Sequence, residues 1–374
     1  MAPTEILARQ HLATIAPLAA KAGLKAAVLT GREKGRERAD VLAGLADGSI
    51  HIVVGTHALF QEGVEYHDLG LAIVDEQHRF GVHQRLAITA KGKAPDMLVM
   101  TATPIPRTLV LTAFGDMEVS RLTEKPAGRR PINTVTVPLD RLDDLVGRME
   151  AAVAEGQKIY WICPLVEESD EIKVTSAEDR HASLKPVFGN RVGLVHGRMK
   201  GAEKDEAMRA FKAGETRVLV ATTVIEVGVD VPDATIIVIE HAERFGLAQL
   251  HQLRGRVGRG EKPSTCVLLY KAPLGETAHK RLSVLRETED GFLISEEDLK
   301  LRGEGDLLGT KQSGTPGFQV ARIEFHADLL ETARDDARLL LSRDPDLISP
   351  RGEAVRILLY LFGRDEAVRL LRAG

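Results

Sequence analysis

The sequence is poor in cysteine and in aromatic residues, and it has no long apolar run. Two of its 374 residues are cysteines, and aromatic residues make up 4% of it. Cys163 and Cys266 each lie in an apolar, strand-like run, which excludes a disulfide scaffold and predicts buried thiols in a cytoplasmic protein. No run approaches the ~18 apolar residues of a membrane span. The first residues do not resemble an export signal, so we expect no membrane partner.

The chain also lacks an excess of positive charge. Its formal net charge is -4, so composition alone does not indicate a nucleic-acid-binding protein. Basic residues nevertheless gather at 121–130 and at 254–262, whereas 287–306 is acidic. Because most such patches are solvated surface, they leave nucleic-acid binding open.

Short apolar runs alternate with helix-like stretches in the first third of the sequence. Four of these runs predict strands, at residues 26–30, 51–55, 71–75 and 97–101. Helices are expected at 5–22 and 33–46. The runs are apolar throughout, which is typical of parallel strands covered by helices on both faces. This pattern predicts an α/β lobe.

A second stretch repeats the pattern after a connector rich in proline, glycine and arginine, at 125–131. Its strands are predicted at 158–163, 192–196, 217–221, 235–240 and 265–270. Beyond residue 275 the strand pattern stops, and we expect helices at 277–288, 321–342 and 355–371, with a glycine-rich segment between the first two. The predicted α/β fold has a first, incomplete parallel-sheet lobe, a second lobe and a mostly helical region, at 1–128, 129–274 and 275–374.

Two adjacent carboxylates, Asp75 and Glu76, follow directly on the apolar run 71–74. Ligands of open parallel sheets bind outside the carboxyl ends of the strands. An aspartate there can hold Mg²⁺, as in nucleotide hydrolases, and the adjacent glutamate can act as a general base on water. The alternative is that the pair only caps the next helix, and these two residues alone favour that alternative.

The segment 252–259 reads Gln-Leu-Arg-Gly-Arg-Val-Gly-Arg. Arg256 and Arg259 are three positions apart, which places them on one face of a helical turn. Paired guanidinium groups suit a polyphosphate, and an arginine aimed at a transferred phosphoryl group can contribute ~10³–10⁵ in rate. A basic loop that faces RNA or DNA is an equally good interpretation.

Hydroxyl side chains follow two further predicted strands. Thr101 and Thr103 end a run of the first lobe, and residues 221–232 end a run of the second. Threonine after a strand is common turn chemistry, so neither segment identifies a site by itself.

A phosphate-binding loop of the form Gly-x-x-x-x-Gly-Lys-Ser/Thr is absent. Gly92-Lys93 is followed by Ala94 and has no upstream glycine at the right distance. That loop supplies the backbone N–H groups and the lysine that hold nucleotide phosphates. We therefore expect an N-terminal truncation, and we expect the 374-residue chain alone to hydrolyse little or no ATP.

Taken in order, these segments resemble the motifs of superfamily 2 helicases. The likeness covers motifs Ia, Ib, II, III, V and VI, at residues 2–11, 55–57, 75–78, 101–103, 222–230 and 252–259. Within the superfamily the chain is most similar to the RecG family of DNA helicases. That likeness lies at 101–108, 163–168, 196–200, 246–252, 290–303 and 309–314, the last two being similar to a translocation motif shared with transcription-repair coupling factors.

The resemblance implies two RecA-like lobes with ATP and Mg²⁺ between them. Asp75 would hold Mg²⁺, Glu76 would activate water, and Arg256 and Arg259 would reach across from the second lobe. Nucleotide would also be contacted or sensed by His78, Gly228, Asp230 and Gln252. DNA phosphates would be held by Pro3, Thr4, Thr56, His57 and Thr222. Lobe closure would be coupled to DNA by Thr101, Thr103 and Arg302, with help from His78.

The activity implied by this resemblance is ATP-dependent unwinding of branched DNA, such as stalled forks and recombination junctions. The implied partners are branched or duplex DNA and a single-stranded-DNA-binding protein, at the bacterial nucleoid. Two alternatives remain open. One is the motor of a transcription-repair coupling factor, and the other is a DNA-binding fragment without ATPase activity.

Overall fold

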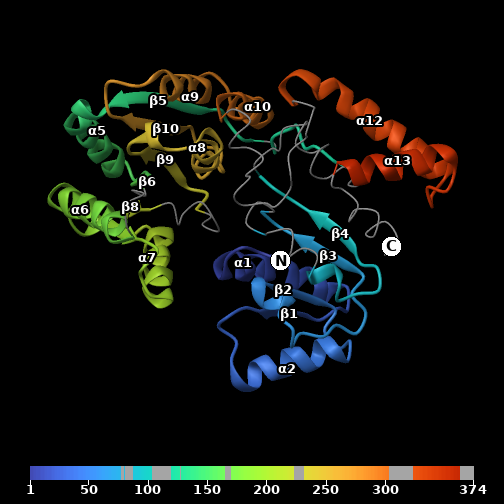
Figure 1. Cartoon of the computed structure of the whole chain (residues 1–374). Helices are drawn as coiled ribbons and strands as arrows, with labels where there is room; N and C mark the ends of the chain where they lie inside the picture. Colours follow the sequence, from blue (N-terminus) through green and yellow to red (C-terminus); the bar gives the residue numbers. More distant parts are fainter. Residues whose placement is uncertain are drawn as a thin grey trace. The chain divides into compact units, whose positions relative to one another are not determined.

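The computed structural model describes residues 1–76, 80, 87–102, 119–126, 128–164, 170–222, 231–302 and 323–362; Figure 1 shows their helices and strands. The chain divides into two compact units, residues 1–104 with 124–301 and residues 105–123 with 302–374. Every sheet in the described part is parallel. The predicted α/β class is therefore confirmed.

The first lobe contains two pairs of parallel strands, β1 with β2 and β3 with β4. Its elements are α1 (Glu5–Lys21), β1 (Ala26–Leu29), α2 (Gly35–Ala46), β2 (Ile52–Gly55), the 3₁₀ turn η1 (His57–Phe60), β3 (Leu71–Val74) and β4 (Asp96–Val99). All four strands lie within two residues of their predicted positions. Thr4 precedes helix α1, and its hydroxyl caps the helix by accepting a hydrogen bond from the Leu7 backbone N–H at 3.3 Å.

The covering of β3 and β4 differs from the prediction. Ala72 and Val74 of β3 are buried, but Leu71 and Ile73 are 55% and 40% exposed. Leu98 of β4 is 49% exposed. Within the described residues these strands are therefore covered on one face, and the expectation of helices on both faces is wrong here. Apolar composition does not tell a doubly covered strand from a singly covered one.

The second lobe is a six-stranded parallel sheet in the order β5-β10-β9-β6-β8-β7. Its strands are β5 (Ile132–Pro138), β6 (Lys158–Ile162), β7 (Val192–Val195), β8 (Val218–Ala221), β9 (Ala234–Ile239) and β10 (Ser264–Tyr270). Its helices are α5 (Leu142–Ala154), α6 (Asp170–Phe188), α7 (Gly201–Ala213) and α8 (Leu247–Arg254), with 3₁₀ turns η3 (Leu139–Arg141), η4 (Gly189–Arg191) and η6 (Ala242–Arg244).

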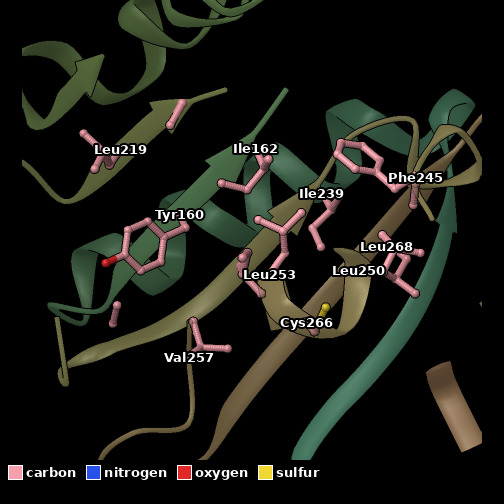
Figure 2. Close-up of a cluster of buried hydrophobic side chains, with 14 of the residues drawn as sticks. Tyr160, Ile162, Leu219, Ile239, Phe245, Leu250, Leu253, Val257, Cys266 and Leu268 are labelled. Carbon is pink, nitrogen blue, oxygen red and sulfur yellow. The ribbon is translucent and has the colours of Figure 1, made fainter. Parts of the chain in front are cut away.

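Both faces of this sheet are buried, as the continuous apolar runs predict. Tyr160 and Ile162 of β6 pack with α7 and α8 in the cluster of Figure 2. Ile159 and Trp161 point to the opposite face, where they pack with α5 and α6. All four side chains are fully buried. Alternate residues of one strand thus serve two cores, which requires an apolar side chain at every position.

Strand β5 was not predicted. Its sequence, Ile-Asn-Thr-Val-Thr-Val-Pro, mixes apolar and polar residues and ends in Pro138. It lies at the edge of the sheet, where it pairs with β10. Edge strands tolerate proline and a half-polar pattern, and the search for wholly apolar runs misses them.

The C-terminal part is helical in its described residues. It contains α9 (Glu276–Glu287), α10 (Gly291–Arg302), α12 (Ile323–Arg343) and α13 (Pro350–Leu361). The helices expected at 277–288 and 321–342 are confirmed. Helix α10 fills the start of the segment taken as glycine-rich, and α13 begins directly after the capping residue Ser349, earlier than predicted. Among the described residues, no helix has the length and apolar character of a bilayer span.

Candidate functional site

Asp75 and Glu76 lie at the carboxyl end of β3, where the sequence places them. Oδ1 of Asp75 accepts a hydrogen bond from the Glu76 backbone N–H at 2.9 Å. Oδ2 of Asp75 lies 2.9 Å from His11 Nε2. Glu76 has φ +52°. A side chain with a Cβ adopts this left-handed backbone at a cost of about 1–3 kcal/mol. Strain of this kind gathers at functional sites, so the geometry favours a functional role for the pair.

The residues predicted to hold DNA phosphates in the first lobe gather at the same edge. The Asp75 backbone N–H donates to the Met1 carbonyl at 3.0 Å, and the Ala2 N–H donates to the Gly55 carbonyl at 2.8 Å. Residues 1–2 therefore lie between the ends of β2 and β3. Pro3 and Thr4 follow on one side, and Thr56 and His57 follow β2 on the other.

The hydroxyl of Thr56 is buried directly after the end of β2. Thr56 is 3% exposed, and its Oγ1 has no hydrogen-bond partner in the part of the chain that the structure describes. An unmade hydrogen bond of a buried hydroxyl costs about 1–3 kcal/mol. Thr101 is at the same edge, because β4 pairs with β3 so that Val99 lies opposite Val74.

Thr222 occupies the equivalent position in the second lobe. It follows β8, is 2% exposed, and its Oγ1 finds no hydrogen-bond partner among the described residues. Its backbone N–H donates to Val195 of the neighbouring strand β7 at 3.3 Å. Each lobe thus presents a buried threonine hydroxyl at the carboxyl edge of its sheet.

Gln252 lies in the last turn of α8, and Arg256 and Arg259 lie in the turn that follows. The Arg259 Nε donates to the Gly255 carbonyl at 3.1 Å. Helix α8 ends at Arg254, and Gly258 has φ +71°. The expectation that the two arginines share a helical face is therefore wrong, because the left-handed glycine turns the chain out of the helix between them.

Two glycines of this turn lie very close to neighbouring residues. A Cβ on Gly258 would lie 2.8 Å from Ile132 Cγ1, at the start of β5, and one on Gly260 would lie 2.9 Å from the Pro232 carbonyl oxygen. Only glycine fits at such distances. The turn with both arginines is thereby packed against β5 and against Pro232.

A neighbouring arginine, Arg254, has a different role. It is 2% exposed and donates from Nη1 to the carbonyls of Leu285 and Thr288, at 2.5 and 2.9 Å. Its Nη2 lies 3.0 Å from His251 Nδ1. Burial and the Arg254 charge lower the pKa of His251 to about 4. Arg254 therefore joins α8 to the end of α9, and the sequence pattern gave no signal that separates it from Arg256 and Arg259.

Several predicted site residues carry no structural description. His78, Thr103, Gly228 and Asp230 lie outside the described residues. Arg302 is the last residue of α10.

The donor set at Asp75 fits a metal that is shared with a ligand. In the described residues no three histidine, cysteine or acidic side chains converge as a protein-only metal site. Mg²⁺ is commonly held by one or two carboxylates together with substrate phosphates and water. Asp75 offers one such carboxylate, so its surroundings suit Mg²⁺ bound jointly with a polyphosphate.

Comparisons with known families cover most of the chain. Residues 1–111 match the family model of the DEAD/DEAH box helicases, and residues 139–261 match the helicase conserved C-terminal domain. Residues 288–360 match the model described as ATP-dependent DNA helicase RecG, domain 3, C-terminal.

The chain is similar to curated ATP-dependent DNA helicases RecG. It is 50% identical to the protein of Pasteurella multocida, over 93% of this chain and 51% of that protein. It is 51% identical to the protein of Bacillus subtilis, over 100% of this chain and 53% of that protein. The chain spans about half the length of the curated relatives it matches.

Solved structures agree with this likeness. A structure of RecG bound to a three-way DNA junction matches with a TM-score of 0.68 and 42% identity, over 88% of this chain and 43% of that one. Yeast Dbp5 bound to RNA and ADP BeF3 matches with a TM-score of 0.56 at 15% identity, over 81% of this chain and 80% of that one. The second match shows the fold alone.

Proposed function

This chain belongs to the RecG family of ATP-dependent DNA helicases, and we propose that it forms the two motor lobes of an enzyme that unwinds branched DNA. The observation that carries the proposal is the carboxyl edge of the first lobe. There Asp75 and the strained Glu76 lie beside the predicted DNA contacts Pro3, Thr4 and Thr56. In this proposal the carboxylate pair serves nucleotide hydrolysis, and the neighbouring threonines contact the phosphates of the bound DNA.

In this proposal the nucleotide is ATP with Mg²⁺. The bound Mg²⁺ would neutralise charge on the phosphates. Asp75 would hold the metal, and Glu76 would accept a proton from the attacking water. Arg256 and Arg259 would stabilise the charge of the transferred phosphoryl group from the second lobe. The remaining nucleotide contacts are proposed at His78, Gly228, Asp230 and Gln252.

We propose that DNA is held mainly through its phosphates, by Pro3, Thr4, Thr56, His57 and Thr222. Support comes from the positions of Thr56 and Thr222, each of which directly follows a strand at the carboxyl edge of its sheet. Aromatic residues make up 4% of the sequence, which leaves few platforms for base stacking. Binding through phosphates weakens steeply with salt.

Coupling between nucleotide and DNA is assigned to Thr101, Thr103 and Arg302. The division into two motor lobes and a helical region, at 1–128, 129–274 and 275–374, belongs to the same proposal. We also propose a cytoplasmic location at the nucleoid and a single-stranded-DNA-binding protein as partner. The match of residues 288–360 to the RecG-specific model favours a RecG function over that of a coupling factor.

The substrate is proposed by analogy with the relative whose structure is described as bound to a three-way DNA junction. The test is phosphate release and strand separation with a three-way junction, measured on the 374-residue chain and on a version extended at the N-terminus to the length of its relatives. We expect junction-stimulated turnover in the extended protein and little in the chain alone. An extended protein that neither hydrolyses ATP nor separates junction strands would contradict the proposal.

A further inference from the structure

Helix α1 connects the two groups of predicted site residues in the first lobe. Thr4 caps its N-terminus, and His11 lies two turns further along, on the side where β3 ends. The His11 ring Nε2 and Asp75 Oδ2 are 2.9 Å apart. The side chains of His11 and Asp75 are 36% and 23% exposed, so the contact is partly shielded from solvent.

This contact fixes the orientation of the Asp75 carboxylate. An ionised carboxylate only accepts hydrogen bonds, so Nε2 of His11 is the donor. The second oxygen, Oδ1, accepts from the Glu76 backbone N–H at 2.9 Å. One donor on each oxygen sets the plane of the carboxylate and leaves further lone pairs on both oxygens for a metal ion.

We propose that His11 is a positioning residue that orients Asp75 toward the Mg²⁺ of a bound nucleotide. The inference rests on the proposed function, because it takes Asp75 as the metal-holding residue. Hydrogen bonds to a ligating carboxylate typically change metal affinity or activity by about 10–100-fold when they are removed. The competing interpretation is that His11 only fastens α1 to β3.

The test uses the N-terminally extended protein with three substitutions. His11→Ala removes the donor, and His11→Gln keeps an amide N–H at a similar reach. Thr14→Ala is the matched control, because Thr14 is exposed on the same helix and its hydroxyl donates only to the Gln10 carbonyl, at 3.2 Å. Two quantities are measured, the Mg²⁺ concentration for half-maximal ATPase and the affinity for Mn²⁺ with adenylyl imidodiphosphate, from the electron paramagnetic resonance signal of free Mn²⁺.

We expect His11→Ala to raise the Mg²⁺ midpoint about tenfold and to weaken Mn²⁺ binding by a similar factor, with kcat at saturating Mg²⁺ and DNA affinity little changed. His11→Gln should restore most of the Mg²⁺ midpoint and of the Mn²⁺ affinity, and Thr14→Ala should match wild type in both measurements. If the wild type hydrolyses ATP but His11→Ala leaves the metal affinity unchanged, the positioning role is overturned. An equal shift of the metal affinity in Thr14→Ala overturns it too. A wild type that neither binds the Mn²⁺ complex nor hydrolyses ATP overturns the proposed function as well.

Discussion

Arg254 donates a hydrogen bond to the Leu285 carbonyl at 2.5 Å from within the core of the second lobe. The guanidinium thereby satisfies a carbonyl near the end of α9, together with that of Thr288. Helix ends leave carbonyls without partners, and this one is completed by a side chain from α8. Arg254 belongs to the basic cluster at 254–262, but its side chain stabilises the fold.

Replacing Arg254 should destabilise the second lobe. Arg254→Ala leaves the buried carbonyls of Leu285 and Thr288 without this donor, at a cost of about 1–3 kcal/mol. Urea unfolding followed by fluorescence measures this, since Trp161 is the only tryptophan and is fully buried in that lobe. Arg254→Lys should recover little, because an ammonium lacks the forked geometry. A surface control, Arg198→Ala, should stay within about 0.5 kcal/mol; equal midpoints for both alanine variants would refute the role.

The stability of this lobe should fall in mild acid. The pKa of His251 is about 4 in the folded chain, lowered by burial and by Arg254, against about 6.5 when unfolded. The unfolded state therefore binds the proton first. The stabilisation is complete above pH 6.5 and is lost as the pH falls toward 4. His251→Gln cannot take up the proton, so its urea midpoint should change less with pH between pH 6.5 and pH 4.5 than that of wild type. The same pH dependence in both proteins would contradict this.

Both cysteines should be inert in the native chain. Burial raises the pKa of Cys266 to about 12, and burial, with the nearby Glu240 carboxylate, raises that of Cys163 well above its usual value. Both thiols are therefore protonated at pH 8, and the thiolate is the reactive form. Dithionitrobenzoate should label neither thiol in the native chain and both in urea. Rapid labelling of either thiol in the native chain would show that the sheet opens around that cysteine.

Glu76 should be needed for hydrolysis but not for DNA binding. In the extended protein, Glu76→Gln removes the proposed general base while keeping the size of the side chain, and we expect at least ~100-fold slower phosphate release. Junction affinity, measured by fluorescence anisotropy, should be unchanged because the proposed DNA contacts lie on other residues. Wild-type ATPase in this variant would remove Glu76 from its proposed role.

Arg256 and Arg259 should act on turnover without supporting the fold. Each change to alanine should slow ATP hydrolysis by about 10³-fold in the extended protein. The urea midpoint from Trp161 fluorescence should stay close to that of wild type, in contrast to Arg254→Ala. Normal turnover in both variants would exclude these arginines from the phosphate site, and a large loss of stability would indicate a structural role instead.

The sequence by itself determined the α/β class, the wholly apolar strands of both lobes and the strand-end position of Asp75 and Glu76. These follow from local pattern. In the second lobe the reason is burial on both faces, which requires an apolar residue at every position, as in Ile159 to Ile162. Tertiary structure decided the rest. Arg254 and Arg259 belong to one basic segment of the sequence. Arg254 is buried because it packs against the end of α9, which the sequence of the segment does not show. The bond between His11 and Asp75 joins residues 64 positions apart, and no local pattern encodes such a contact, because the folded backbone alone brings the two side chains together.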